Sequence, residues 1–267
     1  MEAIFCGVGE AFDEHLSNTS ILVVDDSQGS RRQVLLDCGF SAPGPFWCHA
    51  LDPSALDAVW ISHFHGDHFL GLPQLMLRLF EEGRRQPLTI VCQTGGGATI
   101  KAAMQLAYPG FSEKLTYRLD VVEVTARQTI EQAGLQWAFA PVEHSKPCLA
   151  VRLTAQDGAS LFYSGDGRPS AASQQLARGV NLVIHEAFTF DPQVGEAFNG
   201  HGSVAGCIEF ARLAGARTLA LVHINRDQRR RYGAEIESLA AEIDDLQLLL
   251  PVPGQRMVIA DAKRPQG

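Results

Sequence analysis

His63-Phe64-His65-Gly66-Asp67-His68 places four metal-binding side chains within six residues. The motif follows an apolar, strand-like run at residues 57–62, and in an extended backbone His63 and His65 point to the same side. Gly66 allows a tight turn, so that Asp67 and His68 can face a second point in space. The motif therefore offers two ligand sets, as a centre of two metal ions roughly 3.5–4 Å apart requires.

Three further candidate ligands follow apolar, strand-like runs farther along the chain. Two histidines do not complete the tetrahedral sites that zinc prefers, so other side chains must come from distant segments. The candidates are His144, Asp166 and His223, each just beyond such a run. Because a rigid sheet commonly carries functional residues in the loops along its rim, we expect these strand ends to meet at one site.

The order H-x-H-x-D-H, His, Asp, His resembles that of metallo-β-lactamase-fold hydrolases. The resemblance implies an α/β fold, a four-layer αββα sandwich of two mixed β-sheets with outer helices. It also implies two zinc ions; the imidazole-rich set favours zinc, with Mn²⁺ or iron as alternatives. By the same resemblance the first ion is held by His63, His65 and His144, the second by Asp67, His68 and His223, and Asp166 bridges the two.

Other segments resemble ribonuclease Z and its relatives. They are Phe5-Cys6-Gly7-Val8-Gly9-Glu10-Ala11, Leu35-Leu36-Asp37-Cys38-Gly39, His185-Glu186-Ala187-Phe188 and His201-Gly202-Ser203. The resemblance implies that His201 is the general acid that protonates the leaving oxygen and that Glu186 orients it. A histidine suits this role because it titrates near neutrality. Asp67 would act both as ligand and as the group that orients the attacking hydroxide.

One departure from ribonuclease Z concerns its long arm, which grips transfer RNA. Only 22 positions separate His144 from Asp166 (166 − 144). This length predicts a single hairpin, with strands at 149–154 and 160–163. We therefore expect a small phosphodiester or a nucleic-acid end as the substrate.

Arg226 lies three residues beyond His223 and is the candidate for binding a substrate phosphate, since a guanidinium binds phosphate in a bidentate way.

The function we expect is phosphodiester hydrolysis by hydroxide formed at two metal ions. The alternatives are another hydrolase of the fold (a lactonase, thioesterase or arylsulfatase-like enzyme), an iron oxidoreductase of the fold, and a non-enzymatic regulatory module with a vestigial site. The full ligand set weighs against the last.

Composition is compatible with an enzyme of this kind. The chain has 267 residues, 46% of them hydrophobic, and we expect one domain over residues 1–267. A net charge of −8 does not indicate a nucleic-acid-binding surface, which is usually basic. No apolar run approaches the ~20 residues of a membrane span and no signal-type segment opens the chain, so cytoplasm is expected. The six cysteines form no C-x-x-C pair and are expected to be free. A homodimer is left open.

Hydrophobic patterns predict alternating strands and helices along the whole chain. Ser203 is expected to cap the start of one helix and Gly215 to end it. The predicted strands are near residues 2–7, 20–25, 33–37, 57–62, 88–92, 117–124, 135–142, 148–154, 160–164, 181–185, 218–222, 246–250 and 256–260. The predicted helices are near residues 72–82, 97–107, 170–178, 203–214 and 232–244.

Overall fold

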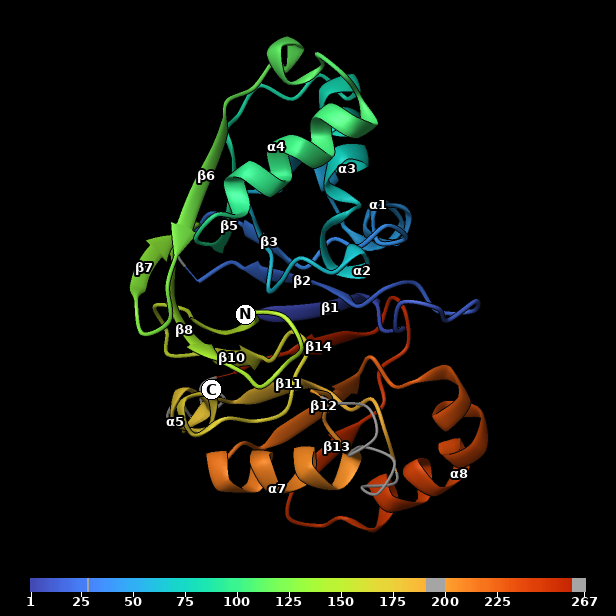
Figure 1. The fold of residues 1–267 in the computed structure, drawn as a ribbon. Coiled ribbons are helices and arrows are strands. Elements are labelled where there is room, and N and C mark those ends of the chain that lie inside the picture. Colours follow the sequence, from blue (N-terminus) through green and yellow to red (C-terminus); the bar gives the residue numbers. More distant parts are fainter. Residues whose placement is uncertain (28, 191–199, 261–267) are drawn as a thin grey trace.

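A computed structural model describes residues 1–27, 29–190 and 200–260, and its strands form two seven-stranded sheets (Figure 1). The first sheet has the order β14-β1-β2-β3-β4-β5-β6, and β3 to β6 run parallel. The strands of this sheet are β1 (Glu2–Gly7), β2 (Ser20–Asp25), β3 (Arg32–Leu36), β4 (Ala58–Trp60), β5 (Leu88–Gln93), β6 (Leu119–Val124) and β14 (Arg256–Val258).

The second sheet has the order β13-β12-β11-β10-β9-β8-β7. Strands β10 to β13 are parallel, and β8 runs in the same direction because β8 and β10 are both antiparallel to β9. The β9–β10 pair is the hairpin predicted between His144 and Asp166. The strands are β7 (Thr129–Gln132), β8 (Leu135–Pro141), β9 (Leu149–Thr154), β10 (Ser160–Tyr163), β11 (Leu182–Glu186), β12 (Thr218–Val222) and β13 (Gln247–Leu249).

Helices cover the outer face of each sheet, which confirms the predicted four-layer αββα arrangement (Figure 1). Helices α1, α3 and α4 lie beyond the first sheet, and α5, α7 and α8 lie beyond the second. The helices are α1 (Pro43–His49), α2 (Gly66–Phe69), α3 (Leu72–Glu81), α4 (Gly96–Ala107), α5 (Ala171–Ala177), α7 (Val204–Ala214) and α8 (Arg226–Glu242), with short 3-10 turns η1 (Pro53–Ala55) and η2 (Ser112–Lys114).

Strand alternation produces three hydrophobic layers between these elements. In β2, Ile21 and Val23 face the core between the sheets, whereas Leu22 and Val24 face the layer under the helices of the first sheet. Trp60 of the first sheet stacks on Phe139 of the second, with ring centroids 4.9 Å apart. Such a buried aromatic pair contributes about 0.5–1.5 kcal/mol beyond its buried area. The core therefore fixes one sheet against the other and, with it, the loops at their rims.

Most predicted elements agree with the structure, and the differences have local causes. Ser203 caps α7 by accepting a hydrogen bond from Gly206 N, and Gly215 ends it with φ of 68°. The prediction that the last helix starts near residue 232 was wrong: α8 begins at Arg226, because the Asn225 side chain caps the preceding turn. The short elements α1, α2 and β7 were not predicted, since none spans enough residues to show a period.

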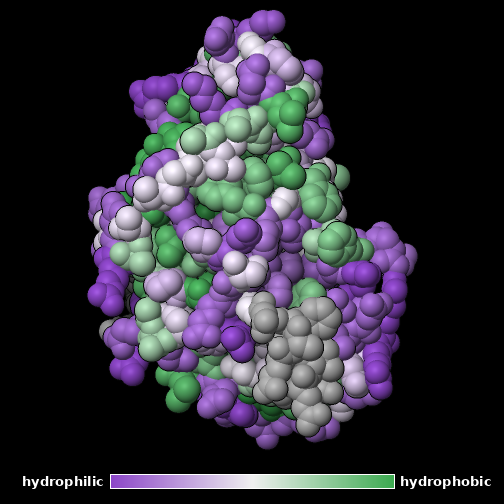
Figure 2. Space-filling view, in the orientation of Figure 1, coloured by the Kyte–Doolittle hydropathy of each residue, from purple (hydrophilic) through white to green (hydrophobic). Residues whose placement is uncertain are grey.

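The surface shown in Figure 2 is mostly hydrophilic, with hydrophobic side chains gathered over α3 and α4.

All six cysteines are free, as expected, and Cys48 is the one that is exposed. Burial raises the pKa of Cys6 and Cys92 to about 12, so these thiols stay protonated. In the part of the chain that the structure describes, no helix is both long and apolar enough to cross a membrane.

Candidate active site

The site lies where the carboxyl ends of strands from both sheets face each other. His63 follows β4 of the first sheet, while His144, Asp166 and His223 follow β8, β10 and β12 of the second. Because these four strands of the two sheets end at the same rim, residues separated by up to 160 positions meet there (223 − 63). His223 has a φ of 54°, a left-handed conformation that is uncommon outside glycine and often found at functional sites.

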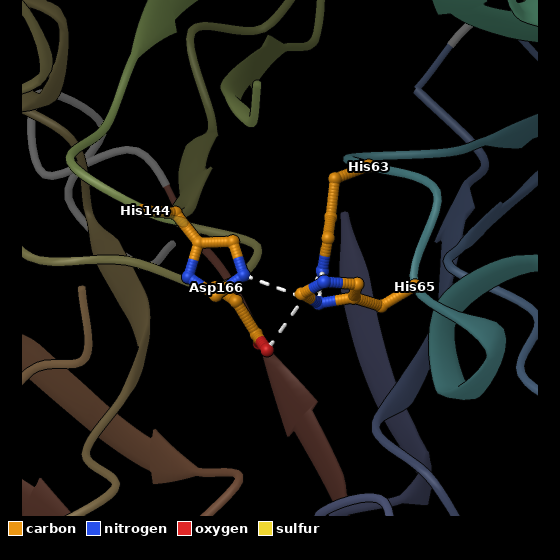
Figure 3. Close-up of side chains that lie close together, drawn as sticks. All are labelled: His63, His65, His144 and Asp166. Carbon is orange, nitrogen blue, oxygen red and sulfur yellow. Dashed lines mark hydrogen bonds and ion pairs between the residues drawn. The ribbon is translucent and has the colours of Figure 1, made fainter. Parts of the chain in front are cut away.

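The first candidate ligand group contains His63, His65, His144 and Asp166. His65 Nδ1 lies 3.0 Å from His63 Nε2 and 3.2 Å from His144 Nε2, and Asp166 Oδ2 lies 3.9 Å from His63 Nε2. In Figure 3, His63 and His65 enter from one side and His144 from the other. Four donor atoms converging on one point is the arrangement that a metal ion requires.

The second group contains Asp67, His68, His223 and again Asp166. Asp67 Oδ2 lies 3.3 Å from His68 Nε2 and 3.2 Å from His223 Nε2, and Asp166 Oδ1 lies 3.3 Å from His68 Nε2. Helix α2 begins at Gly66 and carries Asp67 and His68, which belong to a different ligand group from His65. The structure thus brings together all seven residues in two groups that share Asp166. Their role as metal ligands stays a prediction.

The donor atoms also fit a cation. His68 Nε2 and Asp166 Oδ1 are buried, and among the described residues neither has a hydrogen-bond partner. Buried polar atoms are rarely left without one. A divalent ion between the facing nitrogen and oxygen atoms would satisfy both.

Asp37, which no sequence argument had placed in the site, holds the histidines from behind. It is fully buried, and its Oδ2 lies 2.8 Å from His68 Nδ1, 2.7 Å from Ser62 Oγ and 2.6 Å from Tyr163 OH. Ser62 Oγ in turn lies 3.1 Å from His63 Nδ1. With Nδ1 of His68 donating to Asp37, Nε2 is left to face the ligand group. Asp37 therefore orients one histidine of each group.

Replacing Asp37 by asparagine is expected to weaken metal binding about 10- to 100-fold, the range for partners that orient metal ligands. The amide would present N–H donors to His68 and Tyr163, which are themselves donors. Competition with a chromophoric chelator measures the affinity, and circular dichroism checks that the variant folds. Asp25→Asn changes a buried carboxylate elsewhere, beside the chain's amino terminus, and should leave the affinity unchanged. An Asp37→Asn affinity equal to that of the parent protein would refute this positioning role.

Glu186 and His201 form a pair at the edge of the second ligand group. Glu186 Oε1 lies 3.1 Å from His201 Nδ1 and also accepts hydrogen bonds from the backbone N–H groups of Gly167 and Gly202. The carboxylate is fully buried, whereas the His201 side chain keeps 19% of its surface exposed. Phe188 stacks on the His201 ring at a centroid distance of 4.4 Å. The pair thus has the geometry of a carboxylate that orients a histidine.

Burial and neighbouring charges raise the pKa of some histidines of the site and lower the pKa of others. Burial lowers the pKa of His201, but the hydrogen bond and the negative charge of Glu186 outweigh it and raise this pKa above its ordinary value. Burial also opposes the charged form of His223, yet Asp166 and Asp67 raise its pKa to about 9. Burial lowers the pKa of His63 well below its ordinary value, and the neighbouring His68 adds to this.

A pocket of about 630 Å³ opens directly on this centre. Asp67, Asp166, His201 and His223 all line it. Arg226 also lines the pocket, and its Nη1 lies 2.8 Å from Oε1 of Glu10. The guanidinium is therefore beside the centre but already paired with a carboxylate. Binding of a substrate phosphate by Arg226 stays a prediction.

The sequence from residue 32 to residue 224 matches the family described as "Beta-lactamase superfamily domain". The chain belongs to the beta-lactamase superfamily. Ribonuclease BN of Erwinia tasmaniensis is 24% identical to this superfamily member, in an alignment covering 84% of this chain and 89% of the relative. These matches confirm the predicted family, and the curated relative is likewise a ribonuclease.

Solved structures agree on the fold of this beta-lactamase superfamily protein. Human tRNase Z, short form, superposes with a TM-score of 0.79 at 21% identity, covering 98% of this chain and 100% of that one. A diphosphatase from the PhnP family superposes with a TM-score of 0.69 at 16% identity, covering 97% of this chain and 98% of that one. At these identities the likeness is one of fold.

Proposed function

We propose that the protein is a dinuclear metal-dependent phosphodiesterase that acts on small phosphodiesters or on nucleic-acid ends. The observation that carries the proposal is the pair of ligand groups joined by Asp166, with His201, hydrogen-bonded to Glu186, lining the same pocket. The similarity to ribonuclease BN and to the PhnP-family diphosphatase supports phosphoester chemistry.

Zinc is the metal we propose, because five of the seven candidate ligands in the two groups are imidazoles; Mn²⁺ and iron are the alternatives. When bound, a pair of such ions lowers the pKa of a water molecule toward about 7 and polarises a phosphoryl group. His63, His65 and His144 would hold one ion and Asp67, His68 and His223 the other, with Asp166 between them.

The chain's own residues would then manage protons and orientation. Asp67 lines the pocket, where its second oxygen can orient the attacking group. Glu186 binds Nδ1 of His201, so Nε2 is the nitrogen that can give a proton to the departing oxygen. A leaving alkoxide is strongly basic, and a proton supplied as the bond breaks lowers the barrier to its departure.

The preference for small substrates that we propose is based on segments of ribonuclease BN that have no counterpart in this chain. The alignment with the Erwinia tasmaniensis relative spans 276 positions, whereas 84% of this chain is about 224 residues (0.84 × 267). The relative therefore has about 52 positions without a counterpart here (276 − 224). The short β9–β10 hairpin is the segment where we expected a transfer-RNA arm to be missing.

We therefore expect the zinc-loaded protein to hydrolyse bis-p-nitrophenyl phosphate or cyclic nucleotides more readily than it trims the 3′ extension of a precursor transfer RNA. Initial rates at equal substrate concentration measure this preference. Efficient, site-specific trimming of the RNA would contradict it. Hydrolysis of lactones or thioesters without any phosphodiester hydrolysis would contradict the proposed function itself.

A further inference from the structure

The pocket over the candidate metal centre has two phenylalanines at its mouth that take no part in the core. Phe12 is 74% exposed and Phe40 is 50% exposed, and both line the pocket together with His65 and Asp67. Exposed aromatic rings beside a cavity commonly mark a surface that binds a ligand. Neither ring has a place in the chemistry described above.

Phe12 is held in place by a buried carboxylate. Glu10 is 1% exposed; its Oε2 accepts a hydrogen bond of 2.8 Å from Phe12 N, and its Oε1 accepts one of 2.8 Å from Arg226 Nη1. The guanidinium carbon of Arg226 lies 5.7 Å from the centroid of the Phe12 ring. Since a buried carboxylate is costly unless it is hydrogen-bonded, Glu10 is well suited to fix this ring and this cation relative to each other.

Phe40 lies against the metal-binding motif itself. A Cβ atom built on Gly66 would lie 3.9 Å from Phe40 Cδ1 and 2.9 Å from Leu70 Cδ1. The ring therefore flanks the backbone that joins His65 to Asp67. Phe40, beside the metal-binding motif, and Phe12 thus line the same pocket.

We propose that Phe12 and Phe40 bind the nucleobase of a nucleotide-type phosphodiester whose phosphate lies at the metal centre. The proposal rests on the proposed function. A flat base can stack on such aromatic rings, and this stacking strengthens binding whatever the identity of the base. The pocket is also lined by Asn225, Arg226 and Asp227, and the guanidinium of Arg226 lies beside the Phe12 ring. Asn225 Oδ1, Arg226 Nη1 and Asp227 Oδ1 are bonded within the protein. The other polar atoms of these side chains can hydrogen-bond to the edge of a base, which an alkyl chain cannot do.

The test compares two substrates with the same leaving group, thymidine 5′-(p-nitrophenyl phosphate) and methyl p-nitrophenyl phosphate. We expect kcat/KM of the zinc-loaded protein to be about 10- to 100-fold higher for the thymidine ester, as stacking of one base implies. Phe12→Leu and Phe40→Leu should each reduce this ratio about 5-fold or more, and Phe12→Tyr should preserve it, because tyrosine keeps the flat ring. Leu106→Ala, which alters an exposed side chain on α4, is the matched control and should not change the ratio.

A ratio near one in the parent protein would overturn the proposal, as would leucine variants that affect both esters equally. If neither ester is hydrolysed, the proposed function fails, and the binding site is tested separately by calorimetric titration with thymidine 5′-phosphate and methyl phosphate. Tighter binding of the nucleotide that weakens in both leucine variants supports the site. Equal binding of the two phosphates, or binding unaffected by the variants, refutes it.

Discussion

Replacing Asp166 by alanine is expected to remove both metal ions together and to lower phosphodiesterase turnover by about 10³-fold or more, equivalent to about 4 kcal/mol. Among the described residues, Asp166 is the one that belongs to both four-residue ligand groups, with Oδ2 toward His63 and His223 and Oδ1 toward His68. A bridging carboxylate also offsets the repulsion between two cations a few ångströms apart. Its loss therefore affects both sites at once.

Elemental analysis after zinc reconstitution and desalting measures the effect of Asp166→Ala. The parent protein should retain about two ions per chain, since seven ligand side chains are too many for one tetrahedral ion. The variant should retain less than one. Asp244→Ala, which removes an exposed carboxylate beyond α8, is the matched control and should keep the full content. A variant that still binds one ion with the parent affinity would show that Asp166 is not a bridge.

The second large effect is expected at His201. His201→Ala should keep the full metal content and lose about 10²–10⁴-fold in turnover on substrates with an alkoxide leaving group, the range for a lost general acid. The loss should be much smaller for p-nitrophenolate, which needs little protonation to depart. Glu186→Gln should show a milder form of the same pattern, because Glu186 acts by orienting His201.

The test of His201 needs both the metal content and the dependence of the rate loss on the leaving group. The reason is that its ring also neighbours His144 and His223, with centroids 5.0 and 6.1 Å away. A variant that loses metal would show that His201 is a ligand or a structural support. A defect of the same size for good and poor leaving groups would likewise exclude the role of proton donor.

The sequence was most informative where the chemistry is local. Four candidate ligands within six residues limit the backbone to a few geometries, and the remaining ligands each follow a strand that hydrophobic periodicity predicts. The three residues His144, Asp166 and His223 could therefore be assigned to one rim before the sheets were known. The resemblance to known enzymes then ordered the residues into two groups, and the structure places them together in those groups.

The residues that could not be predicted depend on contacts between distant segments. Asp37 reaches Tyr163 across 126 positions and across the two sheets, and no periodic pattern encodes that contact. The role of Glu10 likewise requires knowing that the loop after β1 lies beside the start of α8. Helix α2 is only four residues long, too short for a hydrophobic period, yet it carries Asp67 and His68 of the second ligand group.

The most direct test of the account is a zinc titration of metal-free protein, with bound metal and hydrolysis of bis-p-nitrophenyl phosphate followed together. The account predicts that activity rises with bound zinc and reaches its maximum at about two ions per chain. Full activity at one ion per chain would contradict the dinuclear centre. If the protein with both sites filled does not hydrolyse the substrate, the proposed phosphodiesterase activity is contradicted.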